Sequence, residues 1–140
     1  MSTFEIGDIT KLSGLSIPQI EQAISRERID VRGRGRPRQF LARDAFIFCL
    51  IGDLRNRLGI DWKRIRGSTA FPWPIDDLSE IDKIQFLLLT PTADDHDFDV
   101  NAVTRDEIGK DLKSFNTSVG ILIDVMAIKK RIEIFARKRR

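Results

Sequence analysis

The chain has 140 residues, of which 41% are hydrophobic and 32% are charged, as is typical of one ordinary globular domain or two small ones. It contains no run of about 20 apolar residues and no signal-peptide pattern, so we expect no membrane span and a cytoplasmic location, near the nucleoid if it binds DNA. A single cysteine, Cys49, excludes an internal disulfide and a thiolate metal cluster. Its apolar neighbours predict a buried, unreactive thiol.

The formal net charge of +3 is small, but it is unevenly distributed. Residues 1–66 carry 13 Lys and Arg against 8 Asp and Glu, whereas the rest of the chain carries 11 against 13. Between Arg26 and Arg43 all seven basic residues are arginines, and only Glu27 and Asp30 oppose them. Because the planar guanidinium group suits phosphates and guanine edges, we expect the first half of the chain to face a polyanion.

Apolar spacing predicts two short helices at the start of the chain. The first would bury a stripe made of Ile6, Ile9 and Leu12. It should end at Ser13-Gly14, after which Ser16 is a suitable N-cap and Pro18 is tolerated in the first turn of the second helix. The second helix would bury Ile17, Ile20 and Ile24. Two such helices joined by a short turn with glycine are typical of a helix-turn-helix.

The next segment predicts a β-hairpin wing. Its strands would be 29–31 and 38–40, and its tip would be Arg32-Gly33-Arg34-Gly35-Arg36-Pro37. Alternating glycines suit a tight tip because glycine accepts positive φ. The alternative is a disordered basic loop. A longer helix is predicted over 42–58, apolar on nearly all sides and ended by Gly59, and Asp61 would cap a short helix that carries Trp62 and Ile65.

The second half predicts a small α/β unit after a linker over 67–80, where two prolines flank Trp73 and forbid a helix. Strands are expected over 83–89, 98–103 and 119–123. Thr104 and Glu107 form a capping box for a helix with Ile108, Leu112 and Phe115 on one side. A terminal helix should bury Val125, Ile128, Ile132 and Phe135. We expect the last two strands to be parallel through a right-handed crossover.

The predicted fold class is therefore α+β. It consists of a winged helix-turn-helix over 1–66, the linker over 67–80, and a small α/β domain over 81–140 for oligomerisation or partner binding. The terminal helix and the sheet edge are the surfaces on which we expect self-association. An acidic stretch over 94–99 contains His96, but it lacks the glycine and distal glutamate of a calcium loop, so a solvated loop is predicted there.

Three segments of the first half carry a family pattern: Phe4 to Ser16, the arginine-rich wing that ends at Phe40, and Asp44 to Gly59 followed by Trp62-Lys63-Arg64-Ile65. With them, residues 3–66 resemble the MerR-type winged-helix DNA-binding domain. The resemblance implies a second helix in the major groove, a wing on the DNA backbone, and dimers on inverted half-sites. Glu21-Gln22-Ala23 stands where the family has an Arg-Tyr-Tyr run, and the long dimerising coiled-coil helix and sensor cysteines are missing. These departures argue against a metal-sensing activator.

The candidate DNA contacts lie on the second helix and the wing. Ser16 and Pro18 begin that helix, and its outward side chains Gln19, Gln22 and Arg26 can pair with adenine and guanine edges. The wing candidates, expected on phosphates, are Arg32, Arg34, Arg36 and Arg38. The alternatives are a solvated helix face and a solvated loop. The basic tail 137–140 suits a helix C-terminus, with an extra DNA contact as the alternative.

No catalytic pattern is present, because the chain has one histidine and no phosphate-binding Gly-Lys-Thr loop, so we expect neither an enzyme nor a cofactor. The leading hypothesis is a bacterial or phage transcription regulator that binds double-stranded DNA as a homodimer. One alternative is an excisionase-like recombination accessory or architectural protein that bends DNA. Another is an adaptor whose second half contacts the transcription machinery.

Overall fold

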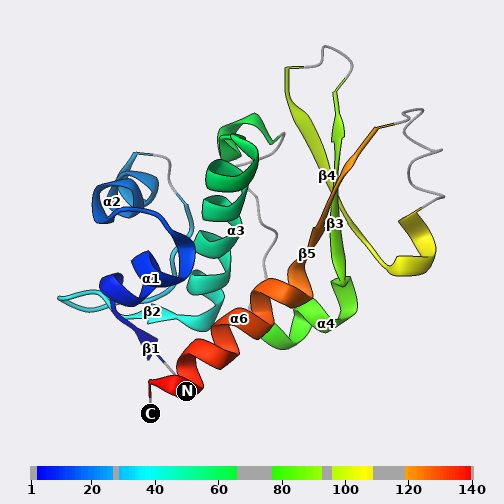
Figure 1. Ribbon diagram of the computed structural model, residues 1–140. Helices are drawn as coiled ribbons and strands as arrows, with labels where there is room; N and C mark the ends of the chain where they lie inside the picture. Colours follow the sequence, from blue (N-terminus) through cyan, green and yellow to red (C-terminus); the bar gives the residue numbers. More distant parts are fainter. Residues whose placement is uncertain (1–2, 27–28, 66–76, 93–95, 109–118, 140) are drawn as a thin grey trace.

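The structure is a computed structural model that describes residues 3–26, 29–65, 77–92, 96–108 and 119–139, and it is a mixed α+β structure, as predicted (Figure 1). The first half contains α1 (Ile6–Ser13), α2 (Ile17–Ser25), α3 (Ala42–Leu58), η1 (Trp62–Arg64) and the strand pair β1 (Thr3–Phe4) and β2 (Phe40–Leu41). The second half contains η3 (Leu78–Glu80), α4 (Ile81–Ile84), β3 (Phe86–Pro91), β4 (Phe98–Val103), η4 (Arg105–Glu107), β5 (Ile121–Asp124) and α6 (Val125–Lys138).

The ends of the N-terminal helices lie where local signals place them. Ser16 caps α2 reciprocally: its hydroxyl accepts the Gln19 N–H at 3.2 Å, and the Gln19 side-chain oxygen accepts the Ser16 N–H at 2.9 Å. Gly14 and Gly59, with φ of 74° and 66°, follow α1 and α3 in the left-handed conformation that ends a helix. The predicted ends of these helices are confirmed.

Helix α3 is the centre of the molecule and has the predicted bounds. Its residues 43–52 are all buried, because α1 packs on one side of it and α6 on another. Gly52 allows α1 to come close, since a Cβ atom there would lie 2.0 Å from the Ser13 carbonyl oxygen. Asp61 accepts the Lys63 N–H at 3.0 Å and caps η1, as predicted.

The three-stranded sheet has the order β4-β3-β5, and β3 is antiparallel to both neighbours. Phe86 is paired with Val103 on one side and with Asp124 on the other. Strands β4 and β5 therefore run in the same direction, as predicted, with β3 between them; most of the connection that joins them, 109–118, lies outside the described residues. The residues of β3 explain its place, because Leu87, Leu88 and Leu89 are all buried and suit a central strand.

Two predicted boundaries in the second half shift. The stretch 83–89 is split between α4 and β3, and the last strand covers Ile121–Asp124 instead of 119–123. The capping box of Thr104 and Glu107 is present, whereas Leu112 and Phe115 lie outside the described residues. The same is true of most of the predicted linker over 67–80.

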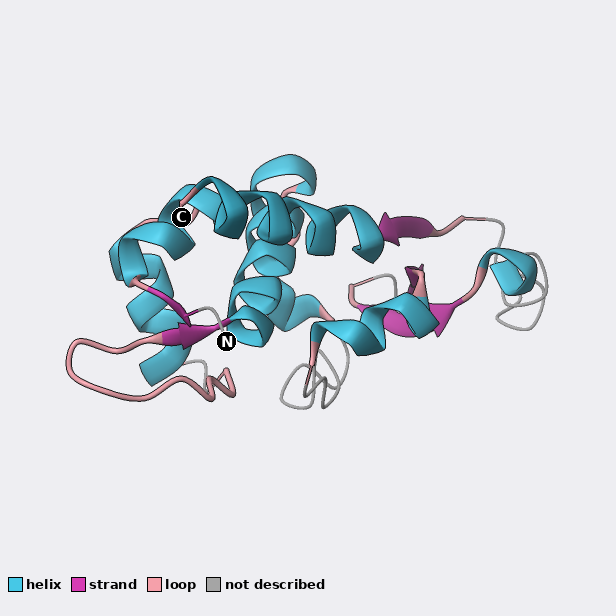
Figure 2. Cartoon of the chain, turned by 90° about the horizontal axis from the view of Figure 1, so that it is seen from below, coloured by secondary structure: helices cyan, strands magenta, loops and turns pink. Residues whose placement is uncertain are grey.

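Helix α6 runs from β5 back across α3 to the N-terminal helices (Figure 2). Its predicted apolar face is confirmed, with Val125, Ile128 and Ile132 buried and Phe135 partly buried. That face packs within the chain, whereas Met126 and Ile134 on the other side of α6 are exposed, so self-association through this helix or the sheet edge stays a prediction. Residues of both halves share one apolar core, including Phe46, Ile81, Leu87 and Ile132. Within the described part of the chain no helix is long and apolar enough to cross a membrane.

Candidate nucleic-acid interface

Helix α2 presents a narrower apolar face than its sequence predicts. Ile20 is fully buried and Ile24 partly so, and Ala23 joins them in the core. The expectation for Ile17 is wrong, because 42% of this residue is exposed. Ile17 is the first residue of the helix, and that first turn extends beyond the core.

The outer side of α2 carries the predicted polar residues. Gln22 and Arg26 are exposed, and their side chains make no hydrogen bond or ion pair to the residues described. Gln19 is half-buried, and its side-chain oxygen is used by the Ser16 cap, so only its amide nitrogen remains for a ligand. Ser16 and Pro18 are exposed at the start of the helix. The two side chains best placed to read a ligand are therefore Gln22 and Arg26.

Arg55 of α3 belongs to the same surface, and the sequence analysis did not single it out. It lines a small cleft of about 30 Å³ together with Gln19, Gln22 and Trp62. Its side chain is exposed and has no ion-pair partner among the described residues. Its position in the last turn of α3 suggests only compensation of the helix dipole, so no sequence signal pointed to this neighbourhood.

Residues 29–39, which we call the wing loop, contain no β-strand, so the predicted hairpin is wrong. The loop is closed by one backbone hydrogen bond, from the Gln39 N–H to the Arg34 carbonyl at 3.0 Å. The strand that follows it, β2, pairs with β1 instead, with Phe40 opposite Phe4. Gly33 is required where the two arms of the loop meet, because a Cβ atom there would lie 1.9 Å from the Gln39 carbonyl oxygen.

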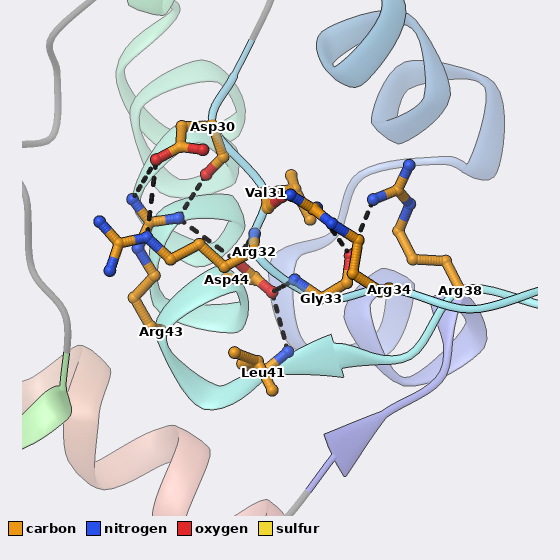
Figure 3. A network of polar contacts seen from close by, with 9 residues as sticks. All are labelled: Asp30, Val31, Arg32, Gly33, Arg34, Arg38, Leu41, Arg43 and Asp44. Atoms are coloured by element: carbon orange, nitrogen blue, oxygen red, sulfur yellow. Dashed lines mark hydrogen bonds and ion pairs between the residues drawn. The ribbon is translucent and has the colours of Figure 1, made fainter.

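The side chain of Asp44 replaces the missing strand partner (Figure 3). It is fully buried, and its two oxygens accept the backbone N–H groups of Arg32, Gly33 and Leu41 at 2.9, 2.9 and 2.8 Å. The bonds to Arg32 and Gly33 hold the first arm of the wing loop on the start of α3, and the bond to Leu41 belongs to the capping box of that helix. Asp44 also stands in the first turn of α3, where a carboxylate suits the helix dipole.

Arg43 neutralises the carboxylates of Asp30 and Asp44 at the base of the wing loop. Its guanidinium group is buried, lies 3.3 Å from the carboxylates of both Asp30 and Asp44, and also donates to the Asp30 carbonyl. Arg32 adds a longer ion pair of 3.7 Å to Asp30. Asp30 and Asp44 are thus neutralised from within the segment, and the charge of Arg32 is partly offset.

The other three arginines of the wing loop have no carboxylate partner in the described structure. Arg34 and Arg38 each donate to a backbone carbonyl, that of Val31 at 2.7 Å and that of Gly33 at 2.8 Å respectively, which shapes the loop and leaves their charge uncompensated (Figure 3). Arg36 is exposed and makes no polar contact with any residue described. The wing loop therefore presents three free positive charges, at Arg34, Arg36 and Arg38.

No protein-family model matches this chain. No curated protein matches it either. The resemblance of residues 3–66 to the MerR-type domain stays a prediction, and we infer the function from the residues of the surface.

Two further features of the sequence with possible chemistry are Cys49 and the acidic stretch over 94–99. Cys49 is fully buried, as predicted, and burial raises the pKa of its thiol to about 11, so it is a poor nucleophile at neutral pH. In the acidic stretch, residues 93–95 lie outside the described residues, and the His96 carbonyl accepts the Arg64 Nε–H at 3.0 Å. No three His, Cys, Asp or Glu side chains of the described ranges are grouped so that they could hold a metal ion.

Proposed function

We propose that this chain binds double-stranded DNA, with the wing loop on the phosphate backbone and α2 in the major groove. The observation that carries the proposal is the set of three arginines without carboxylate partners, held on a loop that Asp44 fastens to α3. Phosphates of a duplex can neutralise such charges, and the release of their counterions favours binding.

The free side chains of α2 support the second part of the proposal. A glutamine amide such as that of Gln22 can pair with the N6 and N7 atoms of adenine, and a guanidinium such as that of Arg26 with the O6 and N7 atoms of guanine. Neither side chain is engaged with other described residues, so reading a base breaks no internal bond. The role that fits this pair of surfaces is a sequence-specific transcription regulator that acts as a homodimer, without a cofactor.

The test is anisotropy titration of a short labelled duplex at several salt concentrations. If Arg34, Arg36 and Arg38 each neutralise a phosphate, log K should fall against log salt with a slope of about −3 per chain, from about −0.9 per contact. Arg36→Gln should weaken binding to every sequence and make the slope less steep by about 1, because this side chain supports nothing else in the loop.

Arg105→Gln is the matched control, since Arg105 is an exposed arginine of η4 at the opposite end of the molecule (Figure 1). It should leave the salt slope unchanged. A wild-type slope near zero, or an equal loss in the two variants, would contradict the role of the wing loop.

Selection from a random duplex pool tests the role of α2. Gln22→Ala should change the preferred sequence with little loss of general affinity. The alternative of an excisionase-like architectural protein stays distinguishable: tandem sites and strong bending of the bound duplex favour it, and an unbent inverted repeat favours a regulator.

A further inference from the structure

A groove with a volume of about 350 Å³ lies between α3, β5 and the first turns of α6, and we call it the α3–β5 groove. Its walls are mainly apolar and include Leu50, Leu54, Leu58, Leu122 and Ile128. Both the volume and the apolar lining are typical of sites for small molecules.

Two leucines on the walls of this groove expose apolar surface to water that a bound ligand would cover. Leu58 of α3 is 50% exposed and Leu122 of β5 is 45% exposed, and both line the hollow. An apolar molecule between them would remove apolar surface from water, which favours binding by about 25 cal/mol for each Å² covered.

The polar groups of the groove are unequally paired. One carboxylate, that of Asp53, serves two guanidinium groups: it accepts the Arg131 Nη2–H at 3.2 Å and lies 3.9 Å from Nε of Arg57. Asp124 also lines the groove, but its carboxylate accepts the Ala127 N–H at 3.2 Å, where the N-terminus of α6 offsets its charge. The lining as a whole is formally neutral, with two guanidinium groups and two carboxylates, but the local cluster of Asp53, Arg57 and Arg131 carries an excess of one positive charge beside an apolar hollow.

Arg131 reaches from the core to the groove. Its Nε atom is buried and its guanidinium group also interacts with the buried Cys49 thiol, so a ligand can approach only the exposed 34% of this side chain. Arg57 is the more accessible of the two, with 75% of its side chain exposed and only a long ion pair to Asp53. A group with two acceptor oxygens suits a guanidinium pair of this kind, because carboxylate and guanidinium match in geometry.

We propose that the α3–β5 groove binds a small monocarboxylic acid with an apolar body. The carboxylate lies beside Arg57 and Arg131, and the apolar body lies between α3 and β5, against Leu54, Leu58 and Leu122. This site does not depend on DNA binding, so its failure would leave the proposed function untouched.

The probes are octanoate and octanol, which share a chain length and differ in the carboxylate. Backbone amide shifts of the full chain should move saturably with octanoate, in α3, β5 and the start of α6, and octanol should bind several-fold more weakly. Arg57→Gln should weaken octanoate binding about fivefold, as expected for a partly exposed ion pair of about 1 kcal/mol, and leave octanol unchanged.

Two further variants make the test specific. Ala127→Leu places a larger side chain on the wall of the groove, and leucine is a good helix former, so α6 should stay intact. This variant should reduce binding of both probes. Lys130→Gln removes an exposed charge of α6 that does not line the groove, so it should change neither.

Three outcomes would overturn the proposal. The first is equal binding of the two probes, and the second is a set of shifted amides outside the three elements. The third is a wild-type dimer in sedimentation whose contacts occupy the same residues, because the groove would then be an interface between copies of this chain.

Discussion

Asp44 shows how one side chain can take the place of a strand. In a hairpin wing, backbone groups of two neighbouring strands would pair with each other, whereas here three backbone N–H groups of the loop and of Leu41 converge on one buried carboxylate. Because Arg43 lies beside it and is also buried, the carboxylate keeps a counter-charge. The position of the three free arginines of the wing loop thus depends on a residue that is itself fully buried.

Asp44→Asn tests this arrangement. The amide has only one acceptor oxygen, and its NH₂ group would face a backbone N–H, while Arg43 would lose its buried partner. We expect the free energy of unfolding to fall by about 3 kcal/mol, measured by urea denaturation, with weaker DNA binding under conditions where the variant is folded.

The control for this substitution is Asp61→Asn, the same change at the exposed cap of η1. Asparagine caps a helix about as well as aspartate, so stability should change by only a few tenths of a kcal/mol. An equal loss of unfolding free energy in the two variants would show that the three hydrogen bonds to Asp44 contribute no more to stability than an exposed helix cap.

At the scale of elements, the contact between α1 and α3 sets the position of the helix-turn-helix. The contact is close because Gly52 of α3 has no side chain where the Ser13 carbonyl approaches. Ser13 is fixed in turn, since its hydroxyl donates to the Ile9 carbonyl at 2.7 Å and accepts the Leu15 N–H at 3.1 Å. Ser13 therefore fixes the turn between α1 and α2 against α3.

Gly52→Ala should lower the free energy of unfolding by about 2 kcal/mol, because α1 and α3 must move apart. The steric cost outweighs the better helix propensity of alanine, which favours the helix by about 1 kcal/mol. Gly7→Ala is the matched control in α1, where a Cβ atom would meet nothing within 4 Å. It should be neutral or raise the melting temperature. If both substitutions changed stability in the same direction, the close contact of α1 with Gly52 would be contradicted.

At the scale of the whole molecule, α6 connects the sheet to the N-terminal helices. Its last residues hold β1 and α1: the Phe135 and Phe4 rings are 6.3 Å apart, and the guanidinium group following the helix, that of Arg139, lies 4.7 Å from the Phe4 ring and 2.7 Å from the Asp8 carboxylate. Arg131 adds an ion pair to Asp53 of α3 in the middle of the helix. The second half is therefore built into the frame that positions the wing loop and α2.

Arg139→Ala should free the last turn of α6 and the β1 strand, and it should lower the free energy of unfolding by about 1–2 kcal/mol. Amide hydrogen exchange is the suitable measurement, because faster exchange should be confined to β1, the start of α1 and the end of α6. Lys138→Ala, which removes a neighbouring exposed cation without a partner in the described structure, should leave exchange unchanged. Faster exchange throughout α3 in both variants would argue against this local connection.

The sequence by itself determined the features that depend on neighbours along the chain. The bounds of α3 and β4, the Ser16 cap of α2 and the glycines after α1 and α3 agree with the structure. A cap or a helix end is decided within about four residues, so its signal lies in a short stretch of sequence. The exposed Gln22, Arg26 and Arg36 were also predicted from such local patterns.

Tertiary structure alone decided which distant segments meet. Phe40 pairs with Phe4 instead of with 29–31, β3 lies between β4 and β5, and α6 packs across α3. In each case several segments have similar local preferences, and the outcome depends on which pairing buries the most apolar surface and satisfies the most backbone groups. The bonds from Arg32 and Gly33 to Asp44 and the neighbourhood of Arg55 depend on that competition, because residues more than ten positions apart in the chain meet there.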